Sequence, residues 1–278
     1  MIVAFSRIQL RWLAAPALLI SCAFSNGVLH AQCHGEDGGS SLVAEIRGGD
    51  TLILEDGRSV RLFGALFPRR GGENQSASQA RDVAEKQIAE LVSGQVVQLQ
   101  LDAARRDRYG RVMAQVFVMK GDQRIWVQEK LVGSGLARVI SSKENRGCIP
   151  ELLSAEEAAR NSRLGNWATG LFSVKQAASE DILAGLAQNF EIIEGRVENV
   201  AEVKGRVYLN FGKNWRRDFT ATIPGDAAKL FPGEADALSK LKGRSVRVRG
   251  WLENVNGPSI NITHPEQLEL LTGDTASH

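Results

Sequence analysis

The feature of this sequence that most constrains its fold is a pair of short apolar runs within residues 46–68. The two runs, 51–54 and 59–64, are rich in β-branched and aliphatic residues and are separated by four residues with Asp-Gly at their centre. Asp-Gly between two such runs predicts a β-hairpin with a type I′ turn, because both central residues of that turn need a positive φ. The hairpin would carry Asp50 at its entry and Arg61 on its second strand.

The N-terminal segment, residues 1–31, is predicted to lie outside the fold. Two arginines precede an apolar run at 12–24 that is too short to span a bilayer, and the small residue Ala31 follows. This pattern indicates a signal peptide cleaved after Ala31, and hence a secreted or periplasmic protein. The residues around Cys22 also resemble a lipoprotein cleavage box, in which case Cys22 would carry a lipid anchor.

Removal of that segment would leave a mature chain with no net charge. The full sequence of 278 residues has 34 basic and 32 acidic side chains, and residues 1–31 contain two arginines and no acid. The mature protein therefore carries no overall charge that would attract an anionic partner. Any affinity for nucleic acid would depend on local clusters of basic residues.

Two cysteines remain beyond the predicted signal peptide, Cys33 and Cys148. An even pair in an oxidising compartment predicts a disulfide, which would tie the mature N-terminus to the start of a helix near Pro150. The alternative is two independent buried thiols, and a count of free thiols under non-reducing conditions distinguishes the two states.

The first part of the chain reads as a mixture of strands and helices. A polar lead-in at 35–40 and a strand at 42–47 precede the hairpin. Ser76 and Gln79 form a capping box that would open an amphipathic helix, which ends before Gly94. Further strands are predicted at 96–101 and 111–118, and further helices at 125–132 and 150–165.

A second pattern follows a predicted linker at 173–189. From 190 to 271 the sequence is again dominated by strand-forming residues. Strands are predicted at 192–200, 206–211, 218–223, 245–253 and 259–263, with a helical insert at 227–241. Five strands with a helix between the third and the fourth predict a second small OB-like β-barrel.

Five motifs in the first part occur in a recognisable order: GDT at 49, VRL at 60, DRYGR at 107, WVQ at 126 and GLARV at 135. In this order they resemble the staphylococcal nuclease-like (thermonuclease) family over residues 42–168. The resemblance implies a five-stranded OB-type barrel with three helices. The region 190–271 looks like a small β-barrel module that follows nuclease-like domains in some bacterial proteins.

The resemblance also assigns residues to a site for phosphodiester hydrolysis. The family grips the phosphate with two arginines, which correspond to Arg61 and Arg111 here. It holds calcium with two aspartates and a threonine carbonyl, and Asp50 matches one of the aspartates. Asp50 can equally be a turn residue before the second strand.

The other assigned positions depart from the family pattern. The second calcium aspartate falls on Leu66, the carbonyl donor on Phe67 and the catalytic glutamate on Arg69. The acid that precedes Asp50 in the family's Asp-Gly-Asp motif is Gly48 here. Arginine cannot accept a proton at physiological pH, and loss of a positioned base typically removes a factor of about 10²–10⁴ in rate. Arg69 would instead join Arg61 and Arg111 in binding phosphate, and Glu73 is the candidate for a substitute base.

The second barrel offers a further candidate surface for nucleic acid. Arg247 and Arg249 alternate with valines and so share one face of a strand. Trp215 lies among basic residues, a composition typical of surfaces that bind single strands. The alternative interpretation is an ordinary polar outer face of a sheet.

The sequence therefore predicts an exported thermonuclease-family protein that binds nucleic acid or a nucleotide, with catalysis weak or lost and calcium binding doubtful. One alternative is an active periplasmic phosphodiesterase that uses Arg61, Arg111 and a substitute acid such as Glu73. A second alternative is an envelope module that binds other proteins and no phosphate.

Overall fold

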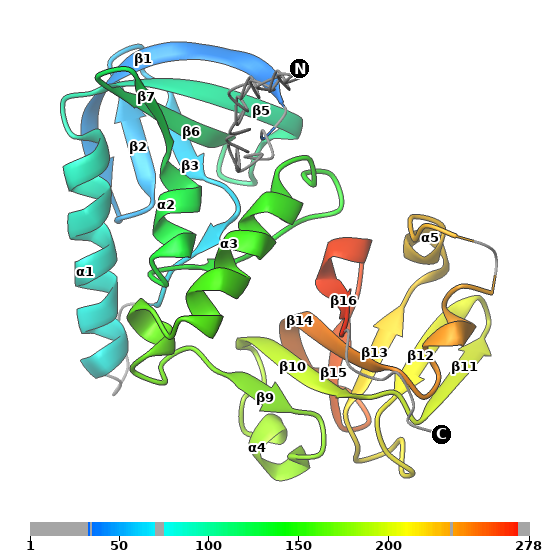
Figure 1. Ribbon diagram of the computed structural model, residues 1–278. Coiled ribbons are helices and arrows are strands. Elements are labelled where there is room, and N and C mark those ends of the chain that lie inside the picture. The colour runs from blue at the N-terminus through cyan, green and yellow to red at the C-terminus, as the bar shows by residue number, and fades with distance from the viewer. Residues whose placement is uncertain (1–32, 34, 70–74, 234–235, 272–278) are drawn as a thin grey trace, which may run out of the picture. The chain divides into compact units, whose positions relative to one another are not determined.

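The computed structural model describes residues 33, 35–69, 75–233 and 236–271, and residues 32–278 belong to one compact unit (Figure 1). The predicted signal peptide, the alternative lipid-anchor site Cys22 and the candidate base Glu73 lie outside the described residues. Among the described helices, none is both long enough and apolar enough to cross a lipid bilayer.

Five strands of the first half close into a barrel. They are β1 (Glu36–Arg47), β2 (Thr51–Leu54), β3 (Ser59–Leu62), β5 (Val96–Arg106) and β6 (Val112–Lys120). Around the barrel the order is β1-β2-β3-β6-β5 and back to β1, with β3 and β6 parallel and the other neighbours antiparallel. A sixth strand, β7 (Gln123–Trp126), extends the sheet beside β6. This is the strand order of an OB barrel and confirms the predicted fold.

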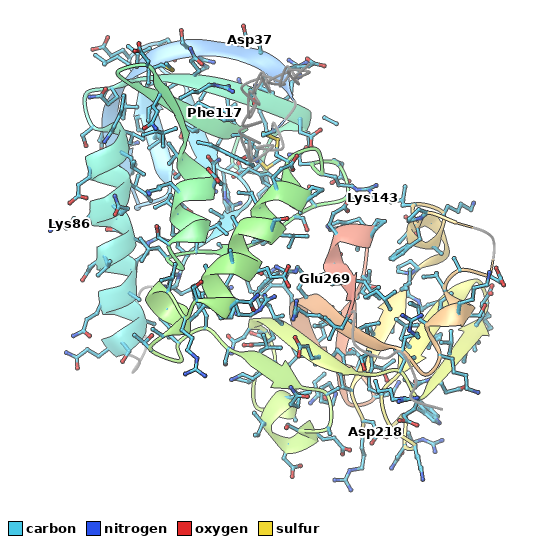
Figure 2. All side chains as sticks on the ribbon, viewed as in Figure 1. Asp37, Lys86, Phe117, Lys143, Asp218 and Glu269 are labelled. Atoms are coloured by element: carbon cyan, nitrogen blue, oxygen red, sulfur yellow. A yellow bond between two sulfur atoms is a disulfide. The ribbon has the colours of Figure 1, made fainter. Side chains whose placement is uncertain are left out.

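Three helices cover this barrel: α1 (Gln75–Val92), α2 (Val127–Gly133) and α3 (Ile149–Asn161). The inner face of α1 buries Ala84, Ile88 and Leu91, as its helical periodicity predicts, while Lys86 points outward (Figure 2). Two short strands, β4 (Ala65–Leu66) and β8 (Arg138–Val139), pair beside the helices. The core of the first half gathers side chains from all of these elements.

The predicted hairpin is present, but its turn differs from type I′. Gly57 has φ +84°, whereas Asp56 is not among the residues with positive φ. The Leu54 N–H donates to the Arg58 carbonyl, so the loop has three residues, 55–57, and the Asp56 carboxylate accepts the Arg58 N–H at 3.0 Å. Only one left-handed residue is needed in such a loop, and glycine supplies it.

Several predicted boundaries are wrong where pairing with distant strands decides the structure. The polar lead-in is strand, because β1 begins at Glu36 and pairs with β5. Helix α1 begins at Gln75, so Ser76 lies inside the helix and is not its N-cap. Ile125 and Trp126 belong to β7, which pairs with β6, and the helix expected there begins only at Val127.

The second half repeats the strand order of the first. Its strands are β10 (Phe190–Arg196), β11 (Asn199–Val203), β12 (Arg206–Asn210), β13 (Thr220–Ile223), β14 (Ser245–Asn254) and β15 (Pro258–Asn261). They follow the order β11-β12-β13-β15-β14-β10, with β13 and β15 parallel. Strands β10 and β11 provide the first OB strand in two consecutive pieces. The predicted second OB-like barrel is therefore present.

The segments around this barrel are more regular than the predicted linker implies. Within 173–189, β9 (Val174–Gln176) pairs in parallel with β10, and α4 (Glu180–Ala184) buries Leu183. The remaining short elements are η1 (Gly165–Trp167), α5 (Gly225–Ala228), η2 (Ser239–Leu241), η3 (Pro265–Gln267) and β16 (Leu268–Leu270). The division into domains 42–168 and 190–271 stays a prediction.

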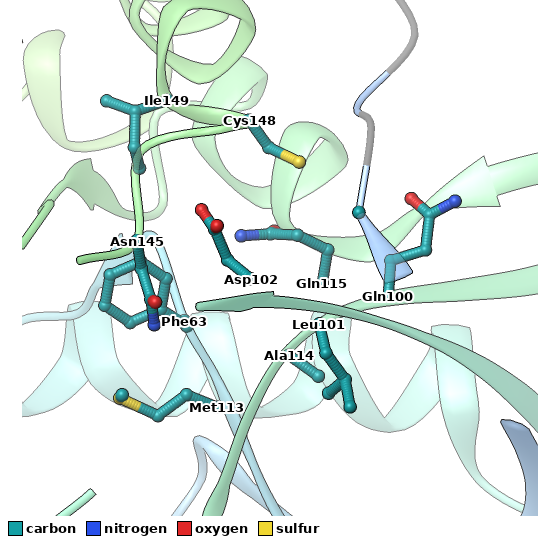
Figure 3. A pocket seen from close by; sticks show the side chains of 11 residues that line it. Phe63, Gln100, Leu101, Asp102, Met113, Ala114, Gln115, Asn145, Cys148 and Ile149 are labelled. Atoms are coloured by element: carbon teal, nitrogen blue, oxygen red, sulfur yellow. The ribbon is translucent and has the colours of Figure 1, made fainter. Parts of the chain in front are cut away.

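The predicted disulfide is present between Cys33 and Cys148, at the residue that precedes α3. Beside it lies a cavity of about 10 Å³, no larger than a water molecule requires (Figure 3). Its polar side chains are already used, since Asp102 accepts the Gly147 N–H and Asn145 bonds both the N–H and the carbonyl of Ala104. This cavity is part of the scaffold and leaves no room for a ligand.

Candidate functional site

Arg111 is held by a tight turn over residues 107–111. The Asp107 carboxylate accepts the backbone N–H groups of Tyr109 and Arg111, at 2.9 and 3.0 Å, and Gly110 closes the turn with φ +79°. The second oxygen of the Asp107 carboxylate accepts a hydrogen bond from Arg111 Nε at 2.8 Å and lies 2.7 Å from Arg111 Nη2. Burial opposes ionisation of Asp107, but the Arg111 side chain and these N–H groups keep its pKa below the ordinary value. Asp107 thus fixes the Arg111 guanidinium before any ligand arrives.

The hairpin brings Asp50 and Thr51 to the same guanidinium and places Arg61 opposite Thr51. Arg111 Nη1 donates to Thr51 Oγ1 at 2.9 Å and lies 4.0 Å from Asp50 Oδ1. Thr51 is opposite Arg61 in the register of β2 and β3, and Arg61 is opposite Met113 of β6. Residues opposite one another in neighbouring strands project from the same face, so Arg61 and Arg111 flank Thr51.

Two guanidinium groups beside a hydroxyl make a site suited to phosphate. Each guanidinium offers paired, planar N–H donors that match the phosphate oxygens. The Arg111 side chain is 24% exposed, and Tyr109, 68% exposed, lies with its ring centroid 5.5 Å from the Arg111 guanidinium carbon. An exposed aromatic ring next to a phosphate site is a surface on which a base can stack.

The positions that the resemblance assigns to calcium are apolar and packed. Leu66 of β4 packs against the cluster that includes Trp167 and Phe172. Phe67, only 5% exposed, belongs to the core of the first barrel. These side chains are buried because removal of their apolar surface from water stabilises the folded protein.

A cation of the protein itself lies beside the same positions. Arg81, on the inner side of α1, donates from Nη2 to the Gly48 carbonyl and from Nε to Glu85 at 2.9 Å. Its guanidinium carbon lies 5.1 Å from the centroid of the Phe67 ring. Gly48 and Phe67 are two positions at which the family pattern has an acid and a calcium-binding carbonyl. Arg81 therefore brings a fixed positive charge to the region that calcium occupies in that pattern.

These residues do not fit a calcium ion, which takes six to eight oxygen ligands. The Gly48 carbonyl already accepts a hydrogen bond from Arg81, and Leu66 has no oxygen in its side chain. The Asp50 carboxylate accepts the Thr51 hydroxyl at 3.1 Å. Within the described part of the chain, no group of three or more His, Cys, Asp or Glu side chains is placed to hold a metal.

Arg69 does not join Arg61 and Arg111 as predicted. Its guanidinium carbon lies 4.9 Å from the centroid of the Trp251 ring, on β14. A planar guanidinium stacks well on an indole, and this contact directs Arg69 away from the hairpin. Glu73 lies outside the described residues, so its role as a substitute base stays a prediction.

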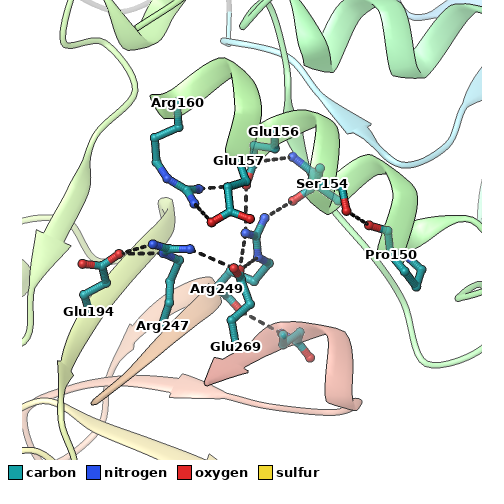
Figure 4. A network of polar contacts seen from close by, with 11 residues as sticks. Pro150, Ser154, Glu156, Glu157, Arg160, Glu194, Arg247, Arg249 and Glu269 are labelled. Atoms are coloured by element: carbon teal, nitrogen blue, oxygen red, sulfur yellow. Dashed lines mark hydrogen bonds and ion pairs between the residues drawn. The ribbon is translucent and has the colours of Figure 1, made fainter. Parts of the chain in front are cut away.

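Arg247 and Arg249 do not form the predicted nucleic-acid surface. Arg249 is 1% exposed, with Nη2 2.5 Å from Glu269 and 2.8 Å from Glu156 of α3 (Figure 4). Arg247 bridges Glu194 and Glu269, at 2.5 and 2.8 Å. Buried cations require such partners. The alternation of these arginines with valines correctly places both on one face of β14. That face is buried, whereas the sequence analysis predicted that it is exposed.

Trp215 is placed as predicted, on the surface. It is 51% exposed and lines an open groove of the second barrel. Asp107 and Arg81 were missed in the sequence. The Asp-x-x-Gly turn signal could have identified Asp107, whereas no local signal links Arg81 to Gly48.

The fold and this site define a class of protein: an OB barrel that carries two arginines, Arg61 and Arg111, beside its second and third strands. Comparison with known proteins agrees. Residues 59–169 match the family model described as "Staphylococcal nuclease homologue". The chain is 31% identical over 133 residues to "Thermonuclease" of Staphylococcus intermedius, a match that covers 47% of this chain and 77% of that protein. The chain therefore belongs to the staphylococcal nuclease family.

Two further relatives come from Bacillus subtilis (strain 168). The chain is 34% identical to "Endonuclease YncB" and 39% identical to "SPbeta prophage-derived endonuclease YokF", each over 124 residues. Each match covers 43% of this chain, but only 57% of the first relative and 40% of the second. The chain thus spans about half the length of these two proteins.

Proposed function

We propose that this protein binds single-stranded nucleic acid through a phosphate held by Arg61 and Arg111, and that its catalysis is weak and insensitive to calcium. The observation that carries the proposal is the contrast within one site. In the half proposed to bind phosphate, Asp107 and Thr51 hold the Arg111 guanidinium, and Arg61 lies opposite Thr51 in the strand register. The half that would hold a metal consists of Leu66 and Phe67 packed among apolar side chains.

The chemistry supports binding over turnover. Hydrolysis needs stabilisation of charge at the phosphorus, a base or metal to activate water, and a proton for the leaving oxygen. Arg61 and Arg111 supply the first of these. Asp50 and Asp107 are the described carboxylates nearest to Arg111 by their contacts, and Asp107 is held by two bonds to its guanidinium. The relatives' names as endonucleases support nucleic acid as the ligand class.

The binding test uses purified mature protein and a short fluorescent oligodeoxynucleotide in an anisotropy titration. Each charge-assisted contact is worth about 1.5–3 kcal/mol, so Arg61→Ala and Arg111→Ala should each weaken binding by about 10- to 150-fold. The matched control is Arg163→Ala, an exposed arginine in the loop after α3. An unchanged affinity in the Arg61→Ala/Arg111→Ala double variant would contradict the proposal, and the absence of any binding by the unaltered protein would favour the envelope module.

Catalysis is tested by digestion of single-stranded DNA with calcium and with a chelator. We expect a rate at least about 10² below that of a family member with the glutamate base, and the same rate in both conditions. Calcium-dependent digestion at a family-like rate would establish the alternative, an active phosphodiesterase, and Glu73→Ala would then test the substitute base.

Export is part of the proposal. Its support is the pairing of Cys33 with Cys148, because disulfides persist in oxidising compartments. The intact mass of the protein purified from cells should correspond to cleavage after Ala31. A mass that includes Cys22 with attached acyl chains would establish the lipid-anchored form, and an uncleaved N-terminus would contradict export.

A further inference from the structure

The outer face of the second barrel carries an open groove with a volume of about 790 Å³. The groove residues come from five strands and from the loops after β12 and β14. They are Asn199, Ala201, Val203, Arg206, Tyr208, Asn210, Trp215, Thr220, Thr222, Glu253, Val255, Asn256, Ser259 and Asn261. Neither Arg61 nor Arg111 of the first barrel lines this groove. The groove also lies outside the region that matches the family model, which ends at residue 169.

Strand geometry explains why these side chains share one face. Alternate residues of a strand point to the same side, and the groove takes every second residue of β11, β12, β13 and β15. The residues between them, such as Leu209, Ala221 and Ile260, are buried in the barrel core. The sheet is therefore apolar inside, whereas its outer face combines amide and hydroxyl groups with the side chains of Ala201, Val203 and Tyr208.

The register arranges the groove residues in rows across the strands. One row runs through Asn199, Asn210, Thr220, Ser259 and Glu253. The next runs through Ala201, Tyr208, Thr222 and Asn261. Each row presents amide or hydroxyl groups spaced by the distance between strands, which is about 4.8 Å.

The hydrogen-bonding groups of the groove are mainly neutral and held in place. Arg206 Nη1 donates to Thr222 Oγ1 at 3.2 Å and to Asn261 Oδ1 at 3.1 Å, and Thr222 Oγ1 donates to Asn261 Oδ1 at 3.1 Å. Asn and Thr side chains can both donate and accept. Such groups match the edges of nucleic-acid bases, which carry donors and acceptors and no charge.

Positive charges lie at the Trp215 end of the groove. Lys213, Arg216 and Arg217 are neighbours of Trp215 in the same loop, and the Arg216 guanidinium carbon lies 4.5 Å from the centroid of the Trp215 ring. Asp218, 8% exposed, holds the loop by accepting the Asn214 N–H at 2.6 Å. A half-exposed indole is thereby presented next to three cations.

We propose that this groove is a second binding site for single-stranded nucleic acid, in which bases stack on Trp215 and Tyr208 and form hydrogen bonds with the amide and hydroxyl groups of the two rows, while the loop cations contact phosphates. The inference rests on the proposed function for the choice of ligand class. A neutral polar groove alone would equally suit an oligosaccharide. The three cations beside Trp215 favour a ligand with phosphates, because a neutral glycan gains nothing from them.

The test measures binding of fluorescent oligothymidylate by anisotropy in the Arg61→Ala/Arg111→Ala background, so that the first barrel does not contribute. Stacking on an aromatic side chain is worth about 1–3 kcal/mol per base. Trp215→Ala should therefore weaken binding by about 5- to 150-fold. The matched control is Trp251→Ala, a 40% exposed tryptophan that does not line the groove, and it should retain the affinity of the background. Thermal unfolding checks that each variant is folded.

Salt dependence gives a second, independent readout. Arg216→Ala/Arg217→Ala should lower the slope of log affinity against log salt by about 0.7 for each phosphate that the loop no longer neutralises. Binding that is unchanged by both Trp215→Ala and the double arginine change would overturn the groove site. So would an effect of Trp215→Ala on a neutral chitooligosaccharide with none on oligothymidylate. Failure of Arg61 and Arg111 to contribute in the otherwise unaltered protein would overturn only the proposed function of the first barrel.

Discussion

At the scale of single residues, Asp107 shows how one carboxylate can prepare another side chain for binding. Asp107 forms bonds to the backbone and the side chain of Arg111 within five residues. The guanidinium therefore loses little conformational freedom when a ligand arrives, and preorganisation of this kind favours affinity. The position of Arg61 is set in a different way, by the register of β3 with β2 and β6.

Leu66 provides a test of the calcium site at this scale. Leu66→Asp restores the residue type of the family pattern, but it would place a carboxylate against the apolar cluster around Trp167. We expect a loss of about 2 kcal/mol or more in the free energy of unfolding. Millimolar calcium should not recover it, because Arg81 still bonds the Gly48 carbonyl.

Denaturant unfolding with calcium and with a chelator measures this effect. Leu66→Ala is the control for reduced packing without added charge. Stabilisation of Leu66→Asp by calcium, absent in Leu66→Ala, would show that the site needs only one carboxylate to bind the ion.

At the scale of elements, the segment that follows α2 and the segment that follows α3 approach each other closely, and each has a glycine at the point of approach. Gly135 has φ +70°, and a Cβ there would overlap the Leu164 carbonyl. Gly165 has φ +51°, and a Cβ there would overlap the Ser134 carbonyl. This close backbone approach sets the direction of the chain that leads to β8 and its contact with β4.

Gly135→Ala should therefore be severely destabilising. The left-handed conformation alone costs an alanine about 1–2 kcal/mol, and the overlap with fixed backbone raises the expected loss to about 3 kcal/mol or more. Gly170→Ala is the matched control, since Gly170 has φ +77° and nothing within 4 Å of an added Cβ. Equal losses in the two variants, measured by denaturant unfolding, would refute the close approach.

At the scale of the whole molecule, the two barrels share a buried ion network. Arg249 of β14 contacts Glu156 of α3 at 2.8 Å and donates weakly to the Val139 carbonyl at 3.5 Å. Arg146 and Glu266 form a second link at 2.8 Å, and His264 bonds Ser141 at 2.6 Å. Removing one partner of a buried pair typically costs about 3–5 kcal/mol, so these contacts make each barrel depend on the other.

Glu269 makes this network sensitive to acid. Burial opposes its ionisation, but Arg249 and Arg247 hold its pKa below the ordinary 4.5. A depressed pKa in the folded state contributes stability that is present above pH 4.5 and is lost as pH falls through the lowered value. Glu269→Gln should therefore be less stable than the original protein at pH 7, with the difference narrowing below about pH 4.5.

Denaturant unfolding of both proteins between pH 7 and pH 3 checks this expectation. Glu202→Gln, on the exposed strand β11, controls for the loss of one negative charge. A constant difference between the original protein and Glu269→Gln across the whole range would contradict the linkage.

The sequence by itself determined the features that depend on nearby residues or on a specific pattern. The hairpin, the glycine after α1 and the strand pattern of the second barrel could be predicted, because turn chemistry and strand periodicity act over a few residues. The first OB barrel, with Arg61 and Arg111, was predicted from the resemblance of its motifs to the family. The disulfide was predictable from the count of cysteines. Even here the predicted turn type at Asp56 was wrong, since the three-residue loop needs only one left-handed residue.

Only the tertiary structure decided which side chains meet across long stretches of sequence. Arg81 reaches Gly48 over 33 residues, and Arg249 reaches Val139 over 110 residues. Strand alternation places Arg247 and Arg249 on one face, but it does not say whether α3 and Glu269 cover that face or water does. The groove around Trp215 likewise follows from the register of five strands. Such placements depend on packing between distant segments, which the local pattern of residues does not encode.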